Sequence, residues 1–275
     1  MTLLQILNMK KLSILLLTFC FLMNATAQTS TSWNGRKCAV VLTYDDGLNI
    51  DLTNAIPALD SAGLKGTFYI SDYFNGLNAQ IPRWKKAAAK GHELANHTLW
   101  HACEGGRVGR EFVKDYDLRF YTIKRMVDEI RGMNNILKAI DGKNKRTFAY
   151  PCGDEKIHDS AYIEPLKNEF VAARGVRGEM LPINKVDLYD VPCYMINGQT
   201  GEQLIDLVKQ AQQKNALLVF LFHGVGGEHS LNVSLEAHRK LLQYLKQNQK
   251  NIWVAPMIDV AEYIAKYQAK ANKTL

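Results

Sequence analysis

The sequence has no CxxC pair, no low-complexity tract, no internal repeat and only one long apolar run. That run lies within the first 27 residues, so the remainder has no segment of the length that a bilayer requires. Without a CxxC pair, a structural zinc site built from cysteines is disfavoured. Because no linker rich in Ser, Gly or Pro marks a domain boundary, we expect a single domain.

The positive charge is scattered along the chain. The formal net charge is +7, and the first 27 residues hold two lysines and no acid, which leaves +5 for the remainder. Lys and Arg cluster at residues 83–86, on an expected helix, and this is typical of a solvated helix face. We therefore expect no nucleic-acid partner, whereas a mildly basic surface suits an anionic glycan. The pattern specifies no oligomeric state.

The first 27 residues predict an export signal. A positive start at Met9-Lys10-Lys11 precedes an apolar core at residues 12–23 that is too short to span a bilayer, and Ala25-Thr26-Ala27 is a small-x-small cleavage site. We expect residues 28–275 to form the mature protein, in the periplasm or secreted, with no stable membrane insertion. Lipid attachment at Cys20 is disfavoured, because Phe19 precedes it and the apolar run continues past it.

Apolar runs alternate with segments of helical period through the mature chain. The runs predict strands at residues 38–44, 67–71, 93–96, 147–150, 170–173, 217–223 and 252–255. The intervening segments predict helices at residues 49–61, 83–90, 116–140, 160–169, 201–215, 234–247 and 258–270. This alternation predicts parallel strands with crossover helices, and hence an α/β fold. About seven strands in one domain favour a closed or nearly closed (β/α) barrel.

Two short stretches predict a metal-dependent hydrolase. In Thr43-Tyr44-Asp45-Asp46-Gly47, two carboxylates follow a buried strand, and in His97-Thr98-Leu99-Trp100-His101 two imidazoles lie four positions apart, which a helical turn would bring to one side. One aspartate and two histidines supply three ligands and leave a position open for water or substrate, with the second aspartate free to act as a base. The competing interpretations are aspartates that cap the next helix and histidines satisfied in the core.

The expected chemical residues all fall at the carboxyl ends of predicted strands, where barrel active sites lie. Asp45 and Asp46 follow the first strand, His97 follows the third, residues 150–153 follow the next and His223 ends the sixth. A histidine with a pKa near neutrality suits a general acid. The alternative for His223 is a buried imidazole bonded to a backbone carbonyl.

Residues 43–47, residues 97–101 and Leu221-Phe222-His223 together resemble the first, second and last motifs of the polysaccharide deacetylases of carbohydrate esterase family 4, the NodB homology domain. The resemblance implies a distorted (β/α) barrel and a divalent metal ion, zinc in the first place and cobalt, nickel or manganese as alternatives. It implies hydrolysis of acetyl groups on an acetylated glycan, from nitrogen in chitin-like or peptidoglycan substrates or from oxygen in acetylated xylan. By position, Asp45 would be the base and His223 the acid, with Asp46, His97 and His101 as metal ligands.

The third motif is matched only in part, at Tyr150-Pro151-Cys152-Gly153. Cys152 stands where the family has an aromatic residue whose backbone N–H helps to hold the oxyanion, a role that needs no particular side chain. Ala149 stands where the family has an arginine that pairs with the base. Arg174, at the end of the next strand, is the preferred replacement over Arg146, which begins its own strand; a surface salt bridge is the alternative for Arg174.

Other features are left open or assigned to structure. The closest remnant of the fourth motif is Asp190-Val191-Pro192, and residues 102–118 form either a wall over the barrel mouth or an ordinary surface loop. Cys38 is expected in the core, and disulfides are permitted among the other mature cysteines without a predicted pairing. The remaining histidines are expected to be structural or without partners, namely His92, His158, His229 and His238.

Three rival functions remain beside an N-deacetylase. An esterase for O-acetyl groups uses the same hydrolysis. A non-catalytic glycan-binding protein on a degenerate barrel is motivated by the missing arginine and the weak fourth motif. A phosphoester hydrolase would need a second metal or residues that cradle phosphate, and neither is visible.

Overall fold

The computed structural model describes residues 33–74 and 76–272. The expected export signal at residues 1–27, with Cys20, lies outside the described residues. Within them, no helix combines the length and the apolar character that crossing a membrane would take.

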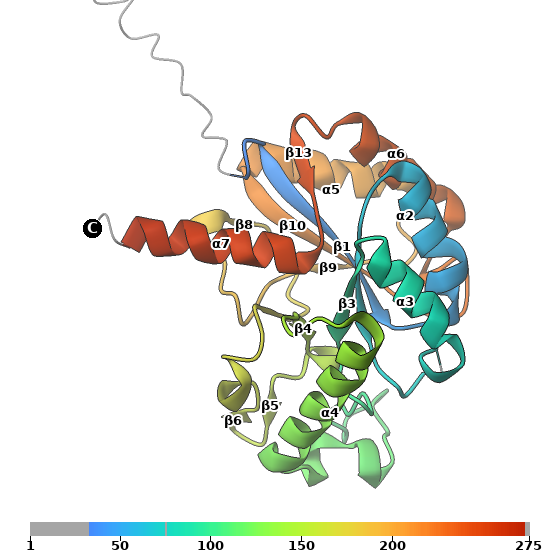
Figure 1. Ribbon diagram of the computed structural model, residues 1–275, viewed down its shortest axis with the longest axis vertical. Helices are drawn as coiled ribbons and strands as arrows, with labels where there is room; N and C mark the ends of the chain where they lie inside the picture. Colours follow the sequence, from blue (N-terminus) through green and yellow to red (C-terminus); the bar gives the residue numbers. More distant parts are fainter. Residues whose placement is uncertain (1–32, 75, 273–275) are drawn as a thin grey trace, which may run out of the picture. The chain divides into compact units, whose positions relative to one another are not determined.

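A curled and mostly parallel sheet forms the centre of the fold (Figure 1). Among the described residues it has nine strands, seven of them in the order β7-β4-β3-β2-β1-β10-β8. The bounds along this path are β7 (Ala173–Arg174), β4 (Phe148–Ala149), β3 (Glu93–Asn96), β2 (Thr67–Ile70), β1 (Cys38–Asp46), β10 (Ala216–Phe222) and β8 (Leu181–Pro182). Only β8 is antiparallel to its neighbour β10, so the predicted α/β fold with parallel strands is confirmed.

The long strand β1 organises this sheet because it has two partners in succession on one side. Its first residues pair with β13 (Ile252–Val254), and its last four pair with β2. In the same way β10 pairs with β8 near its start and with β9 (Tyr194–Met195) near its end. The path ends at β7 and β8, which do not pair with each other in the part of the chain that the structure describes. The sheet is therefore a curled half-barrel that stays open.

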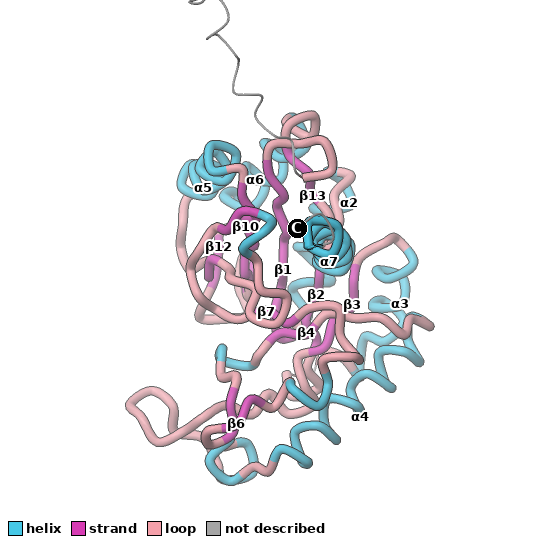
Figure 2. Tube along the Cα trace, turned by 90° about the vertical axis from the view of Figure 1, so that its left-hand side faces the viewer, coloured by secondary structure: helices cyan, strands magenta, loops and turns pink. Residues whose placement is uncertain are grey.

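Helices bury both faces of the sheet (Figure 2). They are α2 (Ile56–Ala62), α3 (Ile81–Ala89), α4 (Ile123–Asp141), α5 (Gly201–Lys214), α6 (Leu235–Gln247) and α7 (Met257–Asn272), with a π-helical turn η1 (Asp51–Ala55) before α2. On β1, Val40, Leu42 and Tyr44 pack in the cluster that includes α2, α3, α5 and α6, whereas Ala39 and Val41 pack against α7. Burial on both faces explains why this strand is continuously apolar.

Short elements complete the chain. Two-residue strands form the pairs β5 (Lys156–Ile157) with β6 (Ser160–Ala161) and β11 (Gly224–Val225) with β12 (Asn232–Val233). Single 3₁₀ turns lie at Asn78–Gln80, Lys114–Tyr116, Leu118–Phe120, Pro151–Gly153, Glu164–Leu166 and Ile183–Lys185.

Two predicted helices differ from the structure. Residues 160–169 form β6 and one 3₁₀ turn instead of a helix, since Pro165 interrupts the segment while Tyr162, Ile163 and Leu166 are buried against α4. The helix expected at residues 116–140 begins only at Ile123, where the side chain of Thr122 accepts the N–H of Arg125 and caps it.

Candidate metal centre

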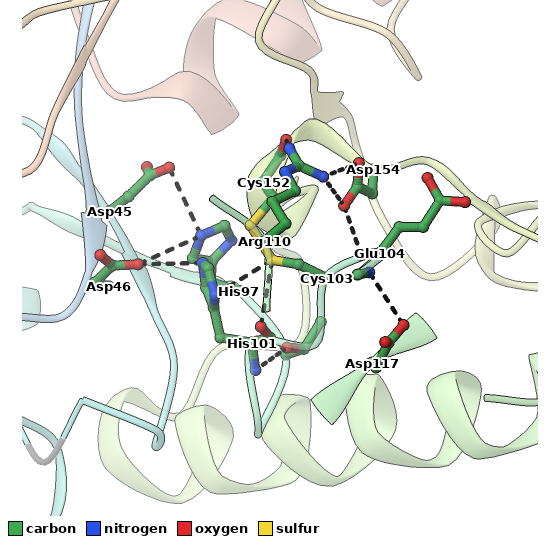
Figure 3. The surroundings of a disulfide bond; sticks show 12 residues. Asp45, Asp46, His97, His101, Cys103, Glu104, Arg110, Asp117, Cys152 and Asp154 are labelled. Carbon is green, nitrogen blue, oxygen red and sulfur yellow. Dashed lines mark hydrogen bonds and ion pairs between the residues drawn. A yellow bond between two sulfur atoms is a disulfide. The ribbon is translucent and has the colours of Figure 1, made fainter. Parts of the chain in front are cut away.

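The two adjacent carboxylates lie at the carboxyl end of β1 and both face His97 (Figure 3). Successive side chains of a strand point to opposite faces, but Asp46 has a φ of 77° and so departs from this alternation. As a result, His97 Nε2 lies 3.7 Å from Asp45 Oδ2 and 3.7 Å from Asp46 Oδ1. Gly47 continues the turn with a φ of 68°, and a Cβ there would meet Ile70 Cγ2 at 2.8 Å. Only glycine fits this close turn.

The two histidines lie in a loop after β3, so the prediction of a helical turn was wrong. Thr98 and His101 have φ values of 65° and 51°, in the left-handed region. Side chains hold this loop in place of helical hydrogen bonds: Asn96 Oδ1 accepts the N–H of Thr98 at 2.8 Å, and Thr98 Oγ1 accepts the N–H of His101 at 2.9 Å. The loop places His101 Nε2 3.4 Å from Asp46 Oδ1.

Hydrogen bonding leaves the Nε2 atoms of both histidines available as ligands. His97 Nδ1 donates to the carbonyl of Ala149 at 2.8 Å, so its Nε2 carries the lone pair. His101 Nδ1 faces Cys103 Sγ at 3.7 Å while its Nε2 faces Asp46. Burial lowers the pKa of both imidazoles, which keeps them in the neutral form that binds metal ions.

Asp46 Oδ1 is buried and has no hydrogen-bond partner. Burial, reinforced by the charge of Asp45 and only partly opposed by that of Arg174, raises the pKa of Asp46 well above its usual range. The ligand atoms of Asp46, His97 and His101 all lie within 4.8 Å of one another. An unpartnered buried oxygen facing two neutral imidazoles fits a divalent cation of the zinc type.

Arg174 donates from Nη2 to Asp45 Oδ2 at the end of β7. Burial raises the pKa of Asp45, but neighbouring groups, led by the charge of Arg174, outweigh this effect, so the net pKa is lowered and the carboxylate is ionised. Arg174 is fully buried, which excludes a surface salt bridge. Arg146 instead binds Asp141 at 2.7 and 2.8 Å.

His223 lies directly after β10, and its buried Nδ1 has no hydrogen-bond partner. Burial lowers its pKa to about 4, against the opposing charge of Asp45. The expected pKa near neutrality is therefore not found in this structure. Its ring stacks on that of His229, with the centroids 4.6 Å apart and an angle of 13° between the planes.

His229 was expected to have no partner, and that interpretation was wrong. Its Nε2 lies 3.7 Å from Asp46 Oδ2. Gly226 and Gly227 precede it with positive φ, and this glycine pair was a signal in the sequence for a tight turn before His229. His238 was also misjudged, since it is buried with Nε2 2.7 Å from the hydroxyl of Tyr44. His92 is structural as expected, because its Nδ1 accepts the N–H of Gly66.

A disulfide between Cys103 and Cys152 joins the loop that follows the second motif to the third motif, beside His101 (Figure 3). Cys152 has a φ of 56°. Arg110 holds the same loop from the other side, since Nη2 donates to the carbonyl of Cys152 at 3.0 Å and Nη1 donates to Asp154. Residues 102–118 are thus fastened to the loop after β4, as a wall beside the site. Cys38 and Cys193 are buried free thiols.

The segment 190–192 lies beside the end of β7, since Val191 forms a parallel bridge with Arg174. Asp190 pairs with Arg177, whereas Arg174 pairs with Asp45. The carbonyl of Val191 accepts the N–H of Gly175 at 3.0 Å, next to Arg174. This segment positions the end of β7.

Comparison with known proteins identifies the family. Residues 33–167 match the family model described as polysaccharide deacetylase. The fold is similar to that of Bacillus subtilis PdaA, a family 4 carbohydrate esterase (TM-score 0.52, 18% identity, 82% of this chain and 80% of that chain). It is also similar to the peptidoglycan deacetylase PdaC from Bacillus subtilis (TM-score 0.52, 14% identity, 88% and 97%) and to the Xyl-CE4 domain of a multidomain xylanase from the hindgut metagenome of Trinervitermes trinervoides (TM-score 0.50, 16% identity, 82% and 89%). The comparison with curated protein sequences returns no match.

The chain belongs to the polysaccharide deacetylase family. At these identities the likeness to solved structures establishes the fold, which is that of the distorted barrel of this family. The family uses a metal ion, and Asp46, His97 and His101 form a site that one fits.

Proposed function

We propose that the protein is an exported, metal-dependent deacetylase that hydrolyses acetyl groups on a glycan. One observation carries the proposal: the unpartnered Oδ1 of Asp46 faces Nε2 of His97 and of His101, with the Arg174-bound carboxylate of Asp45 alongside. Asp46, His97 and His101 would hold the cation. A divalent cation there would polarise the acetyl carbonyl and lower the pKa of a water molecule.

Asp45 is proposed as the base. Arg174 occupies its Oδ2, and the buried Oδ1 has no hydrogen-bond partner, so one oxygen is oriented while the other is available to take a proton from water. The lowered pKa of Asp45 keeps it ionised before the reaction. Removing a positioned base of this kind reduces the rate by roughly 10²–10⁴-fold.

His223 is proposed as the acid that protonates the departing amine or alkoxide. Because burial lowers its pKa to about 4, His223 is neutral at pH 7 in this structure and must gain a proton before it can donate one. The ionised carboxylate of Asp45 favours that protonated form. The cycle would balance if the proton that Asp45 takes from water passes to His223, which then gives it to the leaving group.

The backbone N–H of Cys152 is proposed as an oxyanion donor. The disulfide to Cys103 and the contact of Arg110 with the Cys152 carbonyl hold the backbone of Cys152 beside the site. A preorganised donor of this kind contributes roughly 3–4 kcal/mol to the stabilisation of a transition state.

A group of aromatic side chains, which we call the aromatic shelf, supports the proposal of a sugar substrate. It consists of Tyr73, Trp100 and Tyr116, whose rings lie 5.2 Å (Tyr73 to Tyr116) and 6.3 Å (Trp100 to Tyr116) apart. Tyr73 and Trp100 are exposed. Phe74 connects the shelf to the site, with its ring 5.1 Å from that of His101. Exposed aromatic faces of this kind suit the apolar faces of sugar rings.

The test is acetate release by the purified protein loaded with Zn²⁺, Co²⁺, Ni²⁺ or Mn²⁺. Acetylated chito-oligosaccharides and acetylated xylan separate N- from O-deacetylation. Asp45→Asn is expected to bind the cation but lose turnover, whereas His97→Ala loses both. Asp159→Asn and His158→Ala, at exposed positions, are the matched controls.

Full activity in Asp45→Asn with the cation bound would refute the role of the base. Stoichiometric cation binding together with glycan affinity, but without acetate from any substrate, would favour the non-catalytic glycan-binding alternative. The missing arginine that motivated that alternative has a counterpart here, since Arg174 contacts Asp45. For export, we propose that residues 1–27 are cleaved, which mass determination of the mature protein would show.

A further inference from the structure

We propose that His229 is a positioning residue for the metal ligand Asp46: its Nε2–H donates to Oδ2 and so directs Oδ1 toward His97 and His101. The inference rests on the proposed metal centre. It assigns a role to a loop that none of the three matched motifs includes.

The hydrogen bonding of His229 determines where its proton lies. The backbone N–H of Leu231 donates to His229 Nδ1 at 3.0 Å. An Nδ1 that accepts a hydrogen bond carries no proton, so the neutral ring has its proton on Nε2. This N–H faces Asp46 Oδ2, which lies 3.7 Å away. His229 therefore presents a donor, and not a lone pair, to the carboxylate.

The two oxygens of Asp46 have different neighbours. Oδ1 lies 3.4 Å from His101 Nε2 and 3.7 Å from His97 Nε2, whereas Oδ2 faces His229. A carboxylate that ligates through one oxygen is oriented by a donor on the other, as metal ligands in general are held by an outer partner. Since 3.7 Å is longer than a hydrogen bond, the ring must approach by about 0.5 Å for the donor to engage. His229 is part-exposed and lies on a loop, and the proposal includes this small movement of its ring.

The loop that carries His229 is anchored at both ends. Glu228 accepts the N–H of Asn49 at 3.3 Å and also that of Ile50, at the start of the turn that leads into η1. Asn232 Oδ1 accepts the N–H of Gly227 at 2.9 Å, next to the β11–β12 pair. With its ring also stacked on His223, His229 is held over the site by contacts independent of any cation.

The test compares Zn²⁺ affinity of the metal-free full-length protein and its variants, by competition with a chromophoric chelator. In His229→Leu the donor is lost, and affinity is expected to fall about 10–100-fold. In His229→Gln the side-chain amide can donate to Oδ2, and affinity is expected to stay within a few-fold of the wild type. His158→Gln is the matched control at an exposed histidine, and thermal unfolding of each metal-free variant checks the fold.

Each outcome of this test supports or overturns the positioning role of His229 or the metal centre on which it rests. Unchanged Zn²⁺ affinity in His229→Leu would overturn the inference while leaving the proposed function intact. Equal weakening in Leu and Gln variants, with a changed Co²⁺ absorption spectrum in His229→Gln, would make His229 a ligand and also overturn it. Absence of Zn²⁺ binding in the wild type would refute the proposed metal centre itself. Rescue by Gln with an unchanged Co²⁺ spectrum would support the positioning role.

Discussion

The contact between Arg174 and Asp45 leads to a quantitative prediction for Arg174→Met. Methionine keeps an unbranched apolar chain of similar reach, so the packing against Tyr69 is largely retained while the charge is removed. Asp45 would then be a buried carboxylate without a counter-charge. Removing one partner of a buried ion pair costs about 3–5 kcal/mol in the free energy of unfolding.

The assay is urea unfolding of the metal-free protein at pH 7. Arg177→Met is the control, because Arg177 is half-exposed and pairs with Asp190 and Glu179 on the surface. Its loss should cost no more than about 1 kcal/mol. The double variant Asp45→Asn with Arg174→Met removes both charges, and we expect it to be at least about 1 kcal/mol more stable than Arg174→Met alone, as coupled neighbours require.

Two results would refute this reasoning. One is a loss for Arg174→Met no larger than that for Arg177→Met. The other is a double variant whose loss equals the sum of the two single losses, because independent effects would mean that Arg174 does not compensate the charge of Asp45.

The remaining predictions concern pH, the disulfide and the substrate. Burial lowers the pKa of His92 and of His238 to about 4 in the folded protein. As the pH falls below 6.5, the pKa of these histidines in the unfolded chain, they are therefore protonated in the unfolded chain before they are protonated in the folded protein. Stability is thus fully present above pH 6.5 and should fall toward pH 4 by up to about 3 kcal/mol for each histidine, which denaturant unfolding at pH 7 and pH 4.5 would show; a flat profile would contradict it. Replacing Cys103 and Cys152 together by serine should cost about 2–5 kcal/mol and lower kcat, and a variant as stable and active as the wild type would exclude a role for the crosslink. Trp100→Ala should raise KM for longer glycans more than for a single acetylated sugar, whereas Val108→Ala, at a fully exposed position, should not; an equal effect on both substrates would exclude the aromatic shelf.

Much of the fold could be predicted because strand signals are local. The apolar run at residues 38–44 corresponds to β1, and the carboxylates expected at its end lie there. The approach of Arg174 to Asp45, 129 residues apart, follows from one topological rule, since parallel strands bring their carboxyl ends to the same edge of a sheet. The predicted family membership and fold class are confirmed.

The features that could not be predicted from the sequence depend on contacts between loops. The pairing of Cys103 with Cys152 and the return of His229 over the site depend on loop conformations that no periodicity encodes. The histidine pair at residues 97–101 has helical spacing, yet Asn96 and Thr98 satisfy the backbone with side chains and so hold a different turn. At residues 160–169, buried apolar side chains follow a helical spacing that Pro165 interrupts.

Several unfavourable backbone conformations meet at this site, and hydrogen bonds and a disulfide compensate for their cost. Of the eight non-glycine residues with positive φ in the described ranges, Asp46, Thr98, His101 and Cys152 lie at this one site, and each such conformation costs roughly 1–3 kcal/mol. Contacts of the neighbouring residues compensate for this cost in free energy. The side-chain amide of Asn96 donates to the carbonyl of Ile130 and to Asn134 on α4, both at 2.8 Å, so the histidine loop is fastened to the longest helix, as the disulfide fastens Cys152. Because these supports involve only the protein, the imidazoles and carboxylates already face one another before any cation binds, and binding requires no refolding of the site.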